Sequence, residues 1–202
     1  MTLRFDHLRT INVARCVEDW HHSLEAWSRD DWIVATAGEL GEAGNLLKKL
    51  NRDRDGLIGN NLPAATLRAE LADELADTVI YLDLLAAREG LALGPTALFS
   101  ELTRTAEILP HLSSSPSAHF AVAFRALARA TAELQSAEWY AERKDAQNVT
   151  RHRDAAAACL NETVTRLAAC ANSFGIDLGT AVVSKFNRTS AKHGFSHRLV
   201  PA

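Results

Sequence analysis

Apolar residues recur every three or four positions along almost the whole chain, which is typical of amphipathic helices. The clearest stripes lie in two segments, residues 28–50 and 66–89. Their members are Ile33, Ala37, Leu40, Ala43, Leu47 and Leu50 in the first segment, and Leu67, Leu71, Leu75, Val79, Leu82 and Ala86 in the second. Ile80 and Leu84 lie on the other side of the second helix, so we expect this helix to be buried on two faces.

Capping residues and helix breakers divide the rest of the chain. Ser28, followed by Asp30 and Asp31, is typical of a helix N-cap, and Gly90 is typical of a helix C-terminal end. The other predicted elements are a helix over 4–27, a loop over 51–63, a helix over 95–109, a Ser/Pro linker over 110–117, a long helix over 117–144, a break over 145–150, a helix ending before Gly175, and a last helix over 178–193 between Asp177 and Gly194. No segment has a convincing strand pattern, so the sequence predicts an all-α fold.

Composition agrees with one helical domain. The chain has 202 residues, of which 47% are hydrophobic and 23% charged, and it holds only 10 glycines and 5 prolines, fewer than a turn-rich β-sandwich needs. A net charge of −3 gives no sign of stable nucleic-acid binding. No apolar run approaches the ~18 residues of a membrane span. The opening residues lack a signal peptide's apolar core, and the three cysteines show no metal-type spacing, so we expect a cytoplasmic protein with reduced thiols.

Two acidic pairs carry the most information about chemistry. Glu39 and Glu42 are three residues apart in the first striped helix, and Glu74 and Asp77 are three apart in the second. This spacing places each pair on one helical face. Glu39 lies ~90° and Glu74 ~80° from the centre of its apolar stripe. Residues at the edge of a stripe face a helix–helix seam, so antiparallel packing would bring the four carboxylates together.

Converging carboxylates need a counter-charge. Two unit charges ~4 Å apart repel by ~4 kcal/mol at an effective dielectric constant near 20. Such a group must bind a cation or keep one member protonated. Oxygen ligands select a hard ion, Mg²⁺ or alternatively Mn²⁺. A single ExxE pair is more often a solvated helix face, whereas two such pairs on consecutive helices are much less common.

Glycines 38, 41 and 44 lie in the same helix as the first acidic pair. Each costs ~1 kcal/mol relative to alanine in a helix interior. We therefore expect a close approach by another backbone or by a ligand to offset this cost.

The acidic pairs sit in segments that resemble a known family. Gly38-Glu39-Leu40-Gly41-Glu42 and residues 73–82, DELADTVIYL, resemble the ExxE…ExxD signature of the all-α nucleoside triphosphate pyrophosphohydrolases. This is the MazG-like group, which includes dCTP and dimeric dUTP pyrophosphatases. Residues 183–195, VSKFNRTSAKHGF, are similar to the family's closing K-x-N-R segment. The resemblance covers residues 28–90 and 175–196.

The resemblance implies a fold and a reaction. It implies a four-helix-bundle-like enzyme that cleaves an NTP or dNTP between the α and β phosphates, giving a monophosphate and pyrophosphate. Mg²⁺ held by Glu39, Glu42, Glu74 and Asp77 would bind the phosphates, and Glu39 would also orient or deprotonate the attacking water. It further implies a homodimer or larger homo-oligomer. The rivals are hydrolysis of a related nucleotide such as phosphoribosyl-ATP, and a non-catalytic helical interaction protein.

Basic residues of the last helix are candidate phosphate ligands. Lys185, Arg188 and Lys192 follow one another at i, i+3 and i+7. Alone they suit a helix C-terminus equally well, but the resemblance favours phosphate contact, and Asn187 is a candidate for phosphate or base. Lys48 is more often a solvated charge, with a smaller chance of reaching the site.

Aromatic residues near the first acidic helix are candidates for the base. Trp27 and Trp32 flank its start, and a tryptophan there can stack on a nucleobase, although core packing is expected for at least one of them. His21 and His22 have no partner at ligand spacing and are expected to be ordinary surface or interface histidines.

Residues 91–174 depart from the compact family pattern, in which the closing segment follows soon after the ExxD helix. We interpret them as a helical insertion within a single domain. It would lengthen the bundle, cover the nucleotide site, or replace a subunit contact.

Overall fold

The computed structural model describes residues 3–59, 61–94, 98–102 and 115–200. Over these ranges it is all-helical without a strand, apart from an isolated antiparallel bridge between Arg4 and Leu98. The all-α prediction is therefore confirmed. No described helix is long and apolar enough to cross a membrane.

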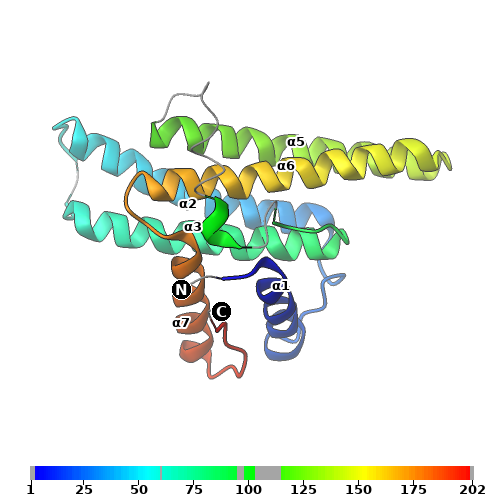
Figure 1. Cartoon of the computed structure of the whole chain (residues 1–202), viewed down its shortest axis with the longest axis horizontal. Coiled ribbons are helices and arrows are strands. Elements are labelled where there is room, and N and C mark those ends of the chain that lie inside the picture. The colour runs from blue at the N-terminus through cyan, green and yellow to red at the C-terminus, as the bar shows by residue number, and fades with distance from the viewer. Residues whose placement is uncertain (1–2, 60, 95–97, 103–114, 201–202) are drawn as a thin grey trace.

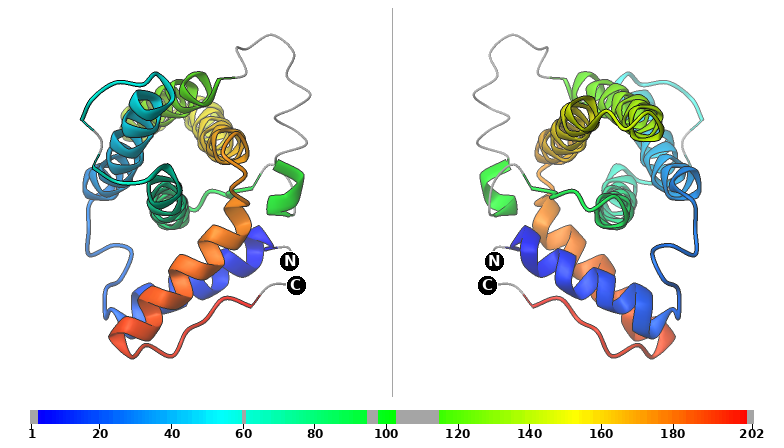
Figure 2. Two further views of the ribbon diagram at one scale, coloured as in Figure 1. Left: turned by 90° about the vertical axis from the view of Figure 1, so that its left-hand side faces the viewer. Right: turned by 90° about the vertical axis from the view of Figure 1, so that its right-hand side faces the viewer.

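Four long helices form a bundle. They are α2 (Arg29–Arg54), α3 (Ala64–Arg88), α5 (Pro116–Glu142) and α6 (Ala146–Asn172). The end views show them around a common centre, with α2 beside α3 and α5, and α6 beside α3 and α5 (Figure 2). The helices of each hairpin, α2–α3 and α5–α6, are antiparallel, whereas α3 and α5 run in the same direction (Figure 1).

Two shorter helices lie outside the bundle against α3. They are α1 (Phe5–Ala14), which continues into the π-helical turn η1 (Arg15–Asp19), and α7 (Leu178–His193). Both cross below the bundle (Figure 1). As a result α3 is covered on opposite sides, and Ile80 and Leu84 are buried as well as the main stripe. This confirms the prediction of a helix buried on two faces.

The helix ends follow their capping residues. Ser28 and Asp31 form a capping box, in which the Asp31 amide donates to Ser28 Oγ (3.2 Å) and the Ser28 amide donates to Asp31 Oδ2 (2.9 Å). Asp177 caps α7 by accepting from the Thr180 amide at 2.6 Å. Gly90 (φ 62°) takes the left-handed conformation directly after α3, which a side chain would strain.

Three boundaries differ from the sequence prediction. The first helix ends at Asp19 instead of 27, and residues 20–28 form an irregular segment. Helix α2 runs on to Arg54, since its polar last turn ends in arginines that suit the helix C-terminus. The turn from α5 to α6 spans only 143–145, with Lys144 at φ 58° and Asp145 capping α6. The predicted 95–109 helix and 110–117 linker lie mostly outside the described residues, although 99–102 are helical.

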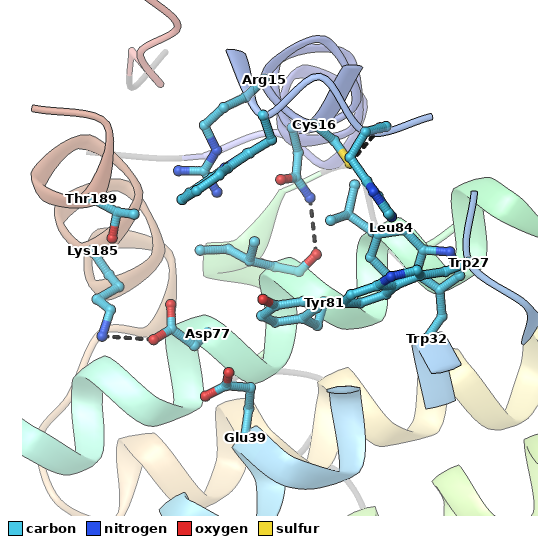
Figure 3. A pocket seen from close by; sticks show the side chains of 14 residues that line it. Arg15, Cys16, Trp27, Trp32, Glu39, Asp77, Tyr81, Leu84, Lys185 and Thr189 are labelled. Atoms are coloured by element: carbon cyan, nitrogen blue, oxygen red, sulfur yellow. Dashed lines mark hydrogen bonds and ion pairs between the residues drawn. The ribbon is translucent and has the colours of Figure 1, made fainter. Parts of the chain in front are cut away.

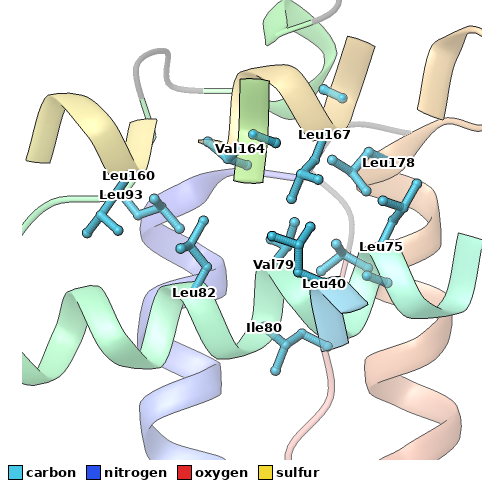
Figure 4. Close-up of a cluster of buried hydrophobic side chains, with 14 of the residues drawn as sticks. Leu40, Leu75, Val79, Ile80, Leu82, Leu93, Leu160, Val164, Leu167 and Leu178 are labelled. Carbon is cyan, nitrogen blue, oxygen red and sulfur yellow. The ribbon is translucent and has the colours of Figure 1, made fainter. Parts of the chain in front are cut away.

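The α5–α6 hairpin belongs to the same core as the segments around it. Leu160, Val164 and Leu167 of α6 face Leu40 of α2 and Val79 of α3 in one hydrophobic cluster (Figure 4). The described part of residues 91–174 therefore supplies two of the four helices of the bundle, a role different from the three that were expected.

Candidate functional site

Three acidic side chains meet in the seam between α2 and α3. Glu39 comes from α2, and Glu74 and Asp77 come from successive turns of α3. Each is half-buried and offers a carboxylate oxygen, and these three oxygens all lie within 4.8 Å of one another. We call these residues the acidic cluster. The predicted convergence is therefore present for three of the four carboxylates.

Glu42 differs from the other three. Its side chain is exposed, and it is not part of the 4.8 Å group. A step of three residues turns the helix by ~300°, so Glu42 points ~60° away from Glu39. On α2 this offset takes Glu42 to the exposed side, whereas the same step on α3 keeps both Glu74 and Asp77 in the seam. Its charge still adds to the rise in the pKa of Glu39 and Glu74, after the larger effect of burial. Glu42 is thus a neighbour at the rim of the cluster.

Burial and mutual repulsion favour protonation of the cluster. Burial raises the pKa of Glu39 to about 7, and the charges of Asp77, Glu74 and Glu42 act in the same direction. Burial also raises the pKa of Glu74 and of Asp77, although Lys185 opposes both changes. The negative charge of the cluster is therefore only partly compensated by the protein itself.

Basic residues of α7 approach this seam. Lys185 Nζ lies 2.6 Å from Asp77 Oδ2. Burial lowers the pKa of Lys185, but the hydrogen bond and charge of Asp77 outweigh it and the net change is upward. Arg188 instead pairs with Asp73 at 2.5 Å, and this pair lies outside the pocket described next.

A pocket opens beside the acidic cluster, with a volume of about 520 Å³. Glu39, Asp77 and Lys185 lie on one side of it, and Trp27 and Trp32 lie on the other (Figure 3). Its full lining is Asn12, Arg15, Cys16, Trp20, His22, Trp27, Trp32, Glu39, Asp77, Ile80, Tyr81, Leu84, Lys185 and Thr189. The pocket therefore has a charged half and an aromatic half, and no described residue of the α5–α6 hairpin lines it.

The two tryptophans make the wall of the aromatic half. Trp32 is 2% exposed and its Nε1 donates to the Leu24 carbonyl at 2.9 Å, so it also belongs to the core. Trp27 is 37% exposed, and its ring centroid lies 4.7 Å from that of Trp32. The expectation that at least one packs in the core is confirmed, while Trp27 is the more accessible to a ligand.

Arg15 is a pocket residue that the sequence analysis missed. It is buried, its guanidinium carbon lies 3.4 Å from the Phe186 ring centroid, and Nη1 donates to the Phe186 carbonyl at 3.2 Å. Burial lowers the pKa of Arg15 to about 10, against the effect of Asp77, so the side chain stays cationic at neutral pH. A signal was present, since Arg15 follows Leu8 and Ile11 at helical spacing on the apolar face.

Asn12 and His22 also line the pocket. His22 was expected to be an ordinary surface or interface histidine. The structure shows it partly buried, with its Nε2 atom buried and its ring edge-on to Trp27 at a centroid distance of 4.9 Å. The irregular segment 20–28 has no periodicity that could have revealed this. His21 is exposed, as expected.

Three other predicted substrate ligands, like Arg188, lie outside the pocket. Asn187 donates to the Leu199 carbonyl and accepts from the Leu199 amide, both at 2.8 Å, so its amide holds the C-terminal segment. Lys48 is exposed, donates to Asn45 Oδ1 at 2.9 Å and lines a different hollow beside α5. Lys192 is exposed and does not line the pocket. Helical spacing predicts which helix carries each of these residues. It does not predict which face of that helix meets the site.

No family model, no curated protein and no solved structure matches this chain, so its resemblance to the MazG-like group stays a prediction.

Proposed function

We propose that the chain is a Mg²⁺-dependent nucleoside triphosphate pyrophosphohydrolase. It would cleave an NTP or dNTP between the α and β phosphates to release the monophosphate and pyrophosphate. The observation that carries this proposal is the acidic cluster, with three carboxylate oxygens within 4.8 Å, beside a pocket of about 520 Å³ with an aromatic wall. The pocket offers a place for a base next to a place for a metal-bound triphosphate.

The residues fit a hard divalent cation. All three donors are carboxylate oxygens, the ligand type that Mg²⁺ and Mn²⁺ prefer. Lys185 pairs with Asp77, and burial together with mutual repulsion raises the pKa of Glu39, as expected where a cation is needed. Glu39, Glu74 and Asp77 would hold the ion, with Glu42 at the rim. A bound Mg²⁺ supplies charge neutralisation for phosphate oxygens and lowers the pKa of a water ligand.

The chain's own residues would position the reactants. Glu39 and Asp77 both belong to the acidic cluster and line the pocket, whereas Glu74 does not line it. Because Asp77 is already paired with Lys185, Glu39 would be the residue that orients the attacking water and takes its proton. The water oxygen bonds to the α phosphorus, and the bond from that phosphorus to the oxygen bridging to the β phosphate breaks. Lys185 and Arg15 supply positive charge on the pocket wall for the phosphates.

The proposal also covers the cellular location and the oligomeric state of the enzyme. We infer a cytoplasmic enzyme because all three cysteines are free. A homodimer or larger homo-oligomer stays a prediction from the resemblance.

A product analysis tests the proposal. The protein is incubated with a panel of NTPs and dNTPs and Mg²⁺, and the products are identified by ³¹P NMR. We expect monophosphate and pyrophosphate, and no turnover in EDTA. Orthophosphate plus diphosphate would contradict cleavage at the α phosphate, and neither turnover nor Mg²⁺-dependent nucleotide binding would favour the interaction protein.

A pair of variants connects this activity to the cluster. Glu39→Gln removes one charge and one metal ligand while keeping the side-chain shape, and should abolish turnover. Glu70→Gln changes a glutamate one turn before Glu74, outside the 4.8 Å group, and should leave turnover unchanged. Equal activity in the two variants would refute the assignment of the cluster.

A further inference from the structure

Asn12 presents an unused hydrogen-bond acceptor at the pocket. The residue is 1% exposed, and its Nδ2 donates to the Ile80 carbonyl at 2.9 Å and to Asp83 Oδ2 at 3.1 Å. Because both partners are acceptors, the amide can be oriented only with its nitrogen toward them. Its Oδ1 atom is buried and has no partner. Buried polar atoms are almost always paired in folded proteins, so an unpaired one in a residue that lines a pocket points to a ligand.

The surroundings hold this amide in place. Asp83 is 1% exposed and its Oδ1 accepts from Arg9 Nε at 2.7 Å. Arg9 in turn donates to the Leu91 carbonyl at 3.1 Å. Asn12 is thus the end of a hydrogen-bonded chain that links α1 to α3 and to the segment after it. Rotation of the amide would break two bonds, which makes Oδ1 a fixed acceptor.

A second unpaired polar atom lies on the same pocket. His22 Nε2 is buried without a partner, and the His22 ring packs against both Trp27 and Trp32. This half of the pocket is also lined by the aromatic or aliphatic side chains of Trp27, Trp32, Tyr81 and Leu84 (Figure 3). A planar ligand with few polar groups at its edge fits such a site.

We propose that the aromatic half of the pocket selects, through Asn12, a nucleobase with an amino group at C4 of a pyrimidine or C6 of a purine, that is, cytosine or adenine. This inference rests on the proposed function for the rest of the nucleotide. Asn12 Oδ1 would accept from the amino group, and His22, with its proton on Nε2, would donate to the neighbouring ring nitrogen.

Asn12 distinguishes between bases because its Nδ2 has no hydrogen left to donate to a ligand. A free asparagine amide pairs with a base through both its oxygen and its nitrogen. Here both Nδ2 hydrogens are engaged, so Asn12 offers only an acceptor. A keto oxygen at the position of the amino group, as in uracil, thymine or guanine, would bring two acceptors together and leave both unpaired. Sites of this kind discriminate strongly because the mismatched polar group is buried.

Binding of nucleoside monophosphates to the whole chain tests the proposal without catalysis. Trp20, Trp27 and Trp32 line the pocket, so tryptophan fluorescence reports on it, and Trp139→Phe removes the tryptophan outside it. We expect dCMP or dAMP to bind at least about tenfold more tightly than dUMP, dTMP and dGMP. Equal binding, tighter binding of a keto base, or no binding of any of the five would overturn the proposal.

Variants test the residue itself. Asn12→Leu should reduce the amino preference to about twofold or less, while Asn148→Ala, an asparagine on α6 outside the pocket, should keep it. Since Asn12→Leu also breaks the bonds to Asp83 and Ile80, its fold is checked by circular dichroism. His22→Phe, which leaves Asn12 intact, should weaken the preference several-fold. A folded Asn12→Leu that retains the full preference would contradict the proposal.

The two proposals can fail separately. Hydrolysis of dUTP in preference to dCTP and dATP would keep the pyrophosphohydrolase and overturn the base selection. Selective binding of dCMP or dAMP without hydrolysis of any triphosphate would keep the base selection and overturn the enzyme.

Discussion

The two hairpins of the bundle are alike in shape and different in chemistry. Hairpin α2–α3 carries the acidic cluster, whereas α5–α6 supplies core side chains such as Leu160 and Leu167 and, among the described residues, none that line the pocket. The difference follows from what covers each hairpin. Helix α3 packs against α1 and α7 as well as the bundle, so its outer face becomes the floor of a site. Hairpin α5–α6 thus contributes to the core, while hairpin α2–α3 carries the candidate site.

The glycines of α2 differ in the same way, since one lies against hairpin α5–α6 and two lie on the stretch with the acidic cluster. An added Cβ at Gly44 would lie 3.1 Å from the Phe120 ring of α5, while Gly38 and Gly41 have no such neighbour within 4 Å. At Gly44, where the hairpins meet, the close neighbour is therefore a side chain and not the backbone or ligand that was expected. At Gly38 and Gly41, on the stretch with the acidic cluster, the space is open.

The largest expected effect is a difference in turnover between a substitution in hairpin α2–α3 and one in hairpin α5–α6. Asp77→Asn removes a metal ligand and the partner of Lys185, so turnover should fall by at least about 100-fold. Glu133→Gln changes a carboxylate of α5 that pairs with His152 and should leave turnover within about twofold. Steady-state kinetics with Mg²⁺ measures both. A similar loss in the two variants would break the comparison.

The second prediction is that a core substitution in hairpin α5–α6 changes the free energy of unfolding but not turnover. Leu160 is fully buried in α6, so Leu160→Ala should lower the free energy of unfolding by ~2–5 kcal/mol through lost burial and a cavity. Turnover per folded molecule should stay unchanged, because the hairpin does not reach the pocket. Urea denaturation and kinetics on the same samples check this. A large fall in turnover of the folded fraction would show that the hairpin also shapes the site.

The third prediction concerns pH without divalent ions. The pKa of Glu39 rises from its ordinary 4.5 to about 7, so the folded state holds this proton more tightly than the unfolded chain. The resulting stability is present below pH 4.5 and is lost as the pH rises through about 7. After allowance for solvent screening the change is on the order of 1 kcal/mol. Thermal melts in EDTA should show a smaller fall from pH 5.5 to 8 in Glu39→Gln than in the wild type, and Mg²⁺ should offset the wild-type fall. Identical pH profiles would argue against a raised pKa.

The smallest effect is expected at the glycines. Gly38→Ala should raise the free energy of unfolding by ~0.5–1 kcal/mol, because alanine is the better helix former and the site is open. Gly44→Ala should give no such gain, since Phe120 must shift. Denaturant midpoints of the two variants measure the difference. If Gly38→Ala also lowers turnover, the open space is used by substrate.

Much of the fold was predictable because helical periodicity and capping are local. The two striped segments became α2 and α3, and Ser28 and Asp177 cap helices as expected. The limits came from interactions between distant segments. The end of the first helix at Asp19 depends on how residues 20–28 fold back over the pocket, and no sequence pattern encodes that path.

The candidate site was predictable to the same extent. Glu39, Glu74 and Asp77 met because stripe edges on neighbouring helices meet. The three-residue spacing is the same in both acidic pairs, so it could not predict that Asp77 lies in the seam while Glu42 is exposed. Asn187 was assigned to substrate, but its amide is held by Leu199, twelve residues away in an irregular segment. Arg15 was predictable in principle, as a charge on an apolar stripe.

The central claim is that the acidic cluster binds a divalent cation, and calorimetric titration of Mg²⁺ tests it most directly. We predict saturable binding to the wild-type protein and to Glu70→Gln, and at least about tenfold weaker binding to Glu74→Gln. Equal Mg²⁺ affinity in Glu74→Gln and the wild type would contradict the account.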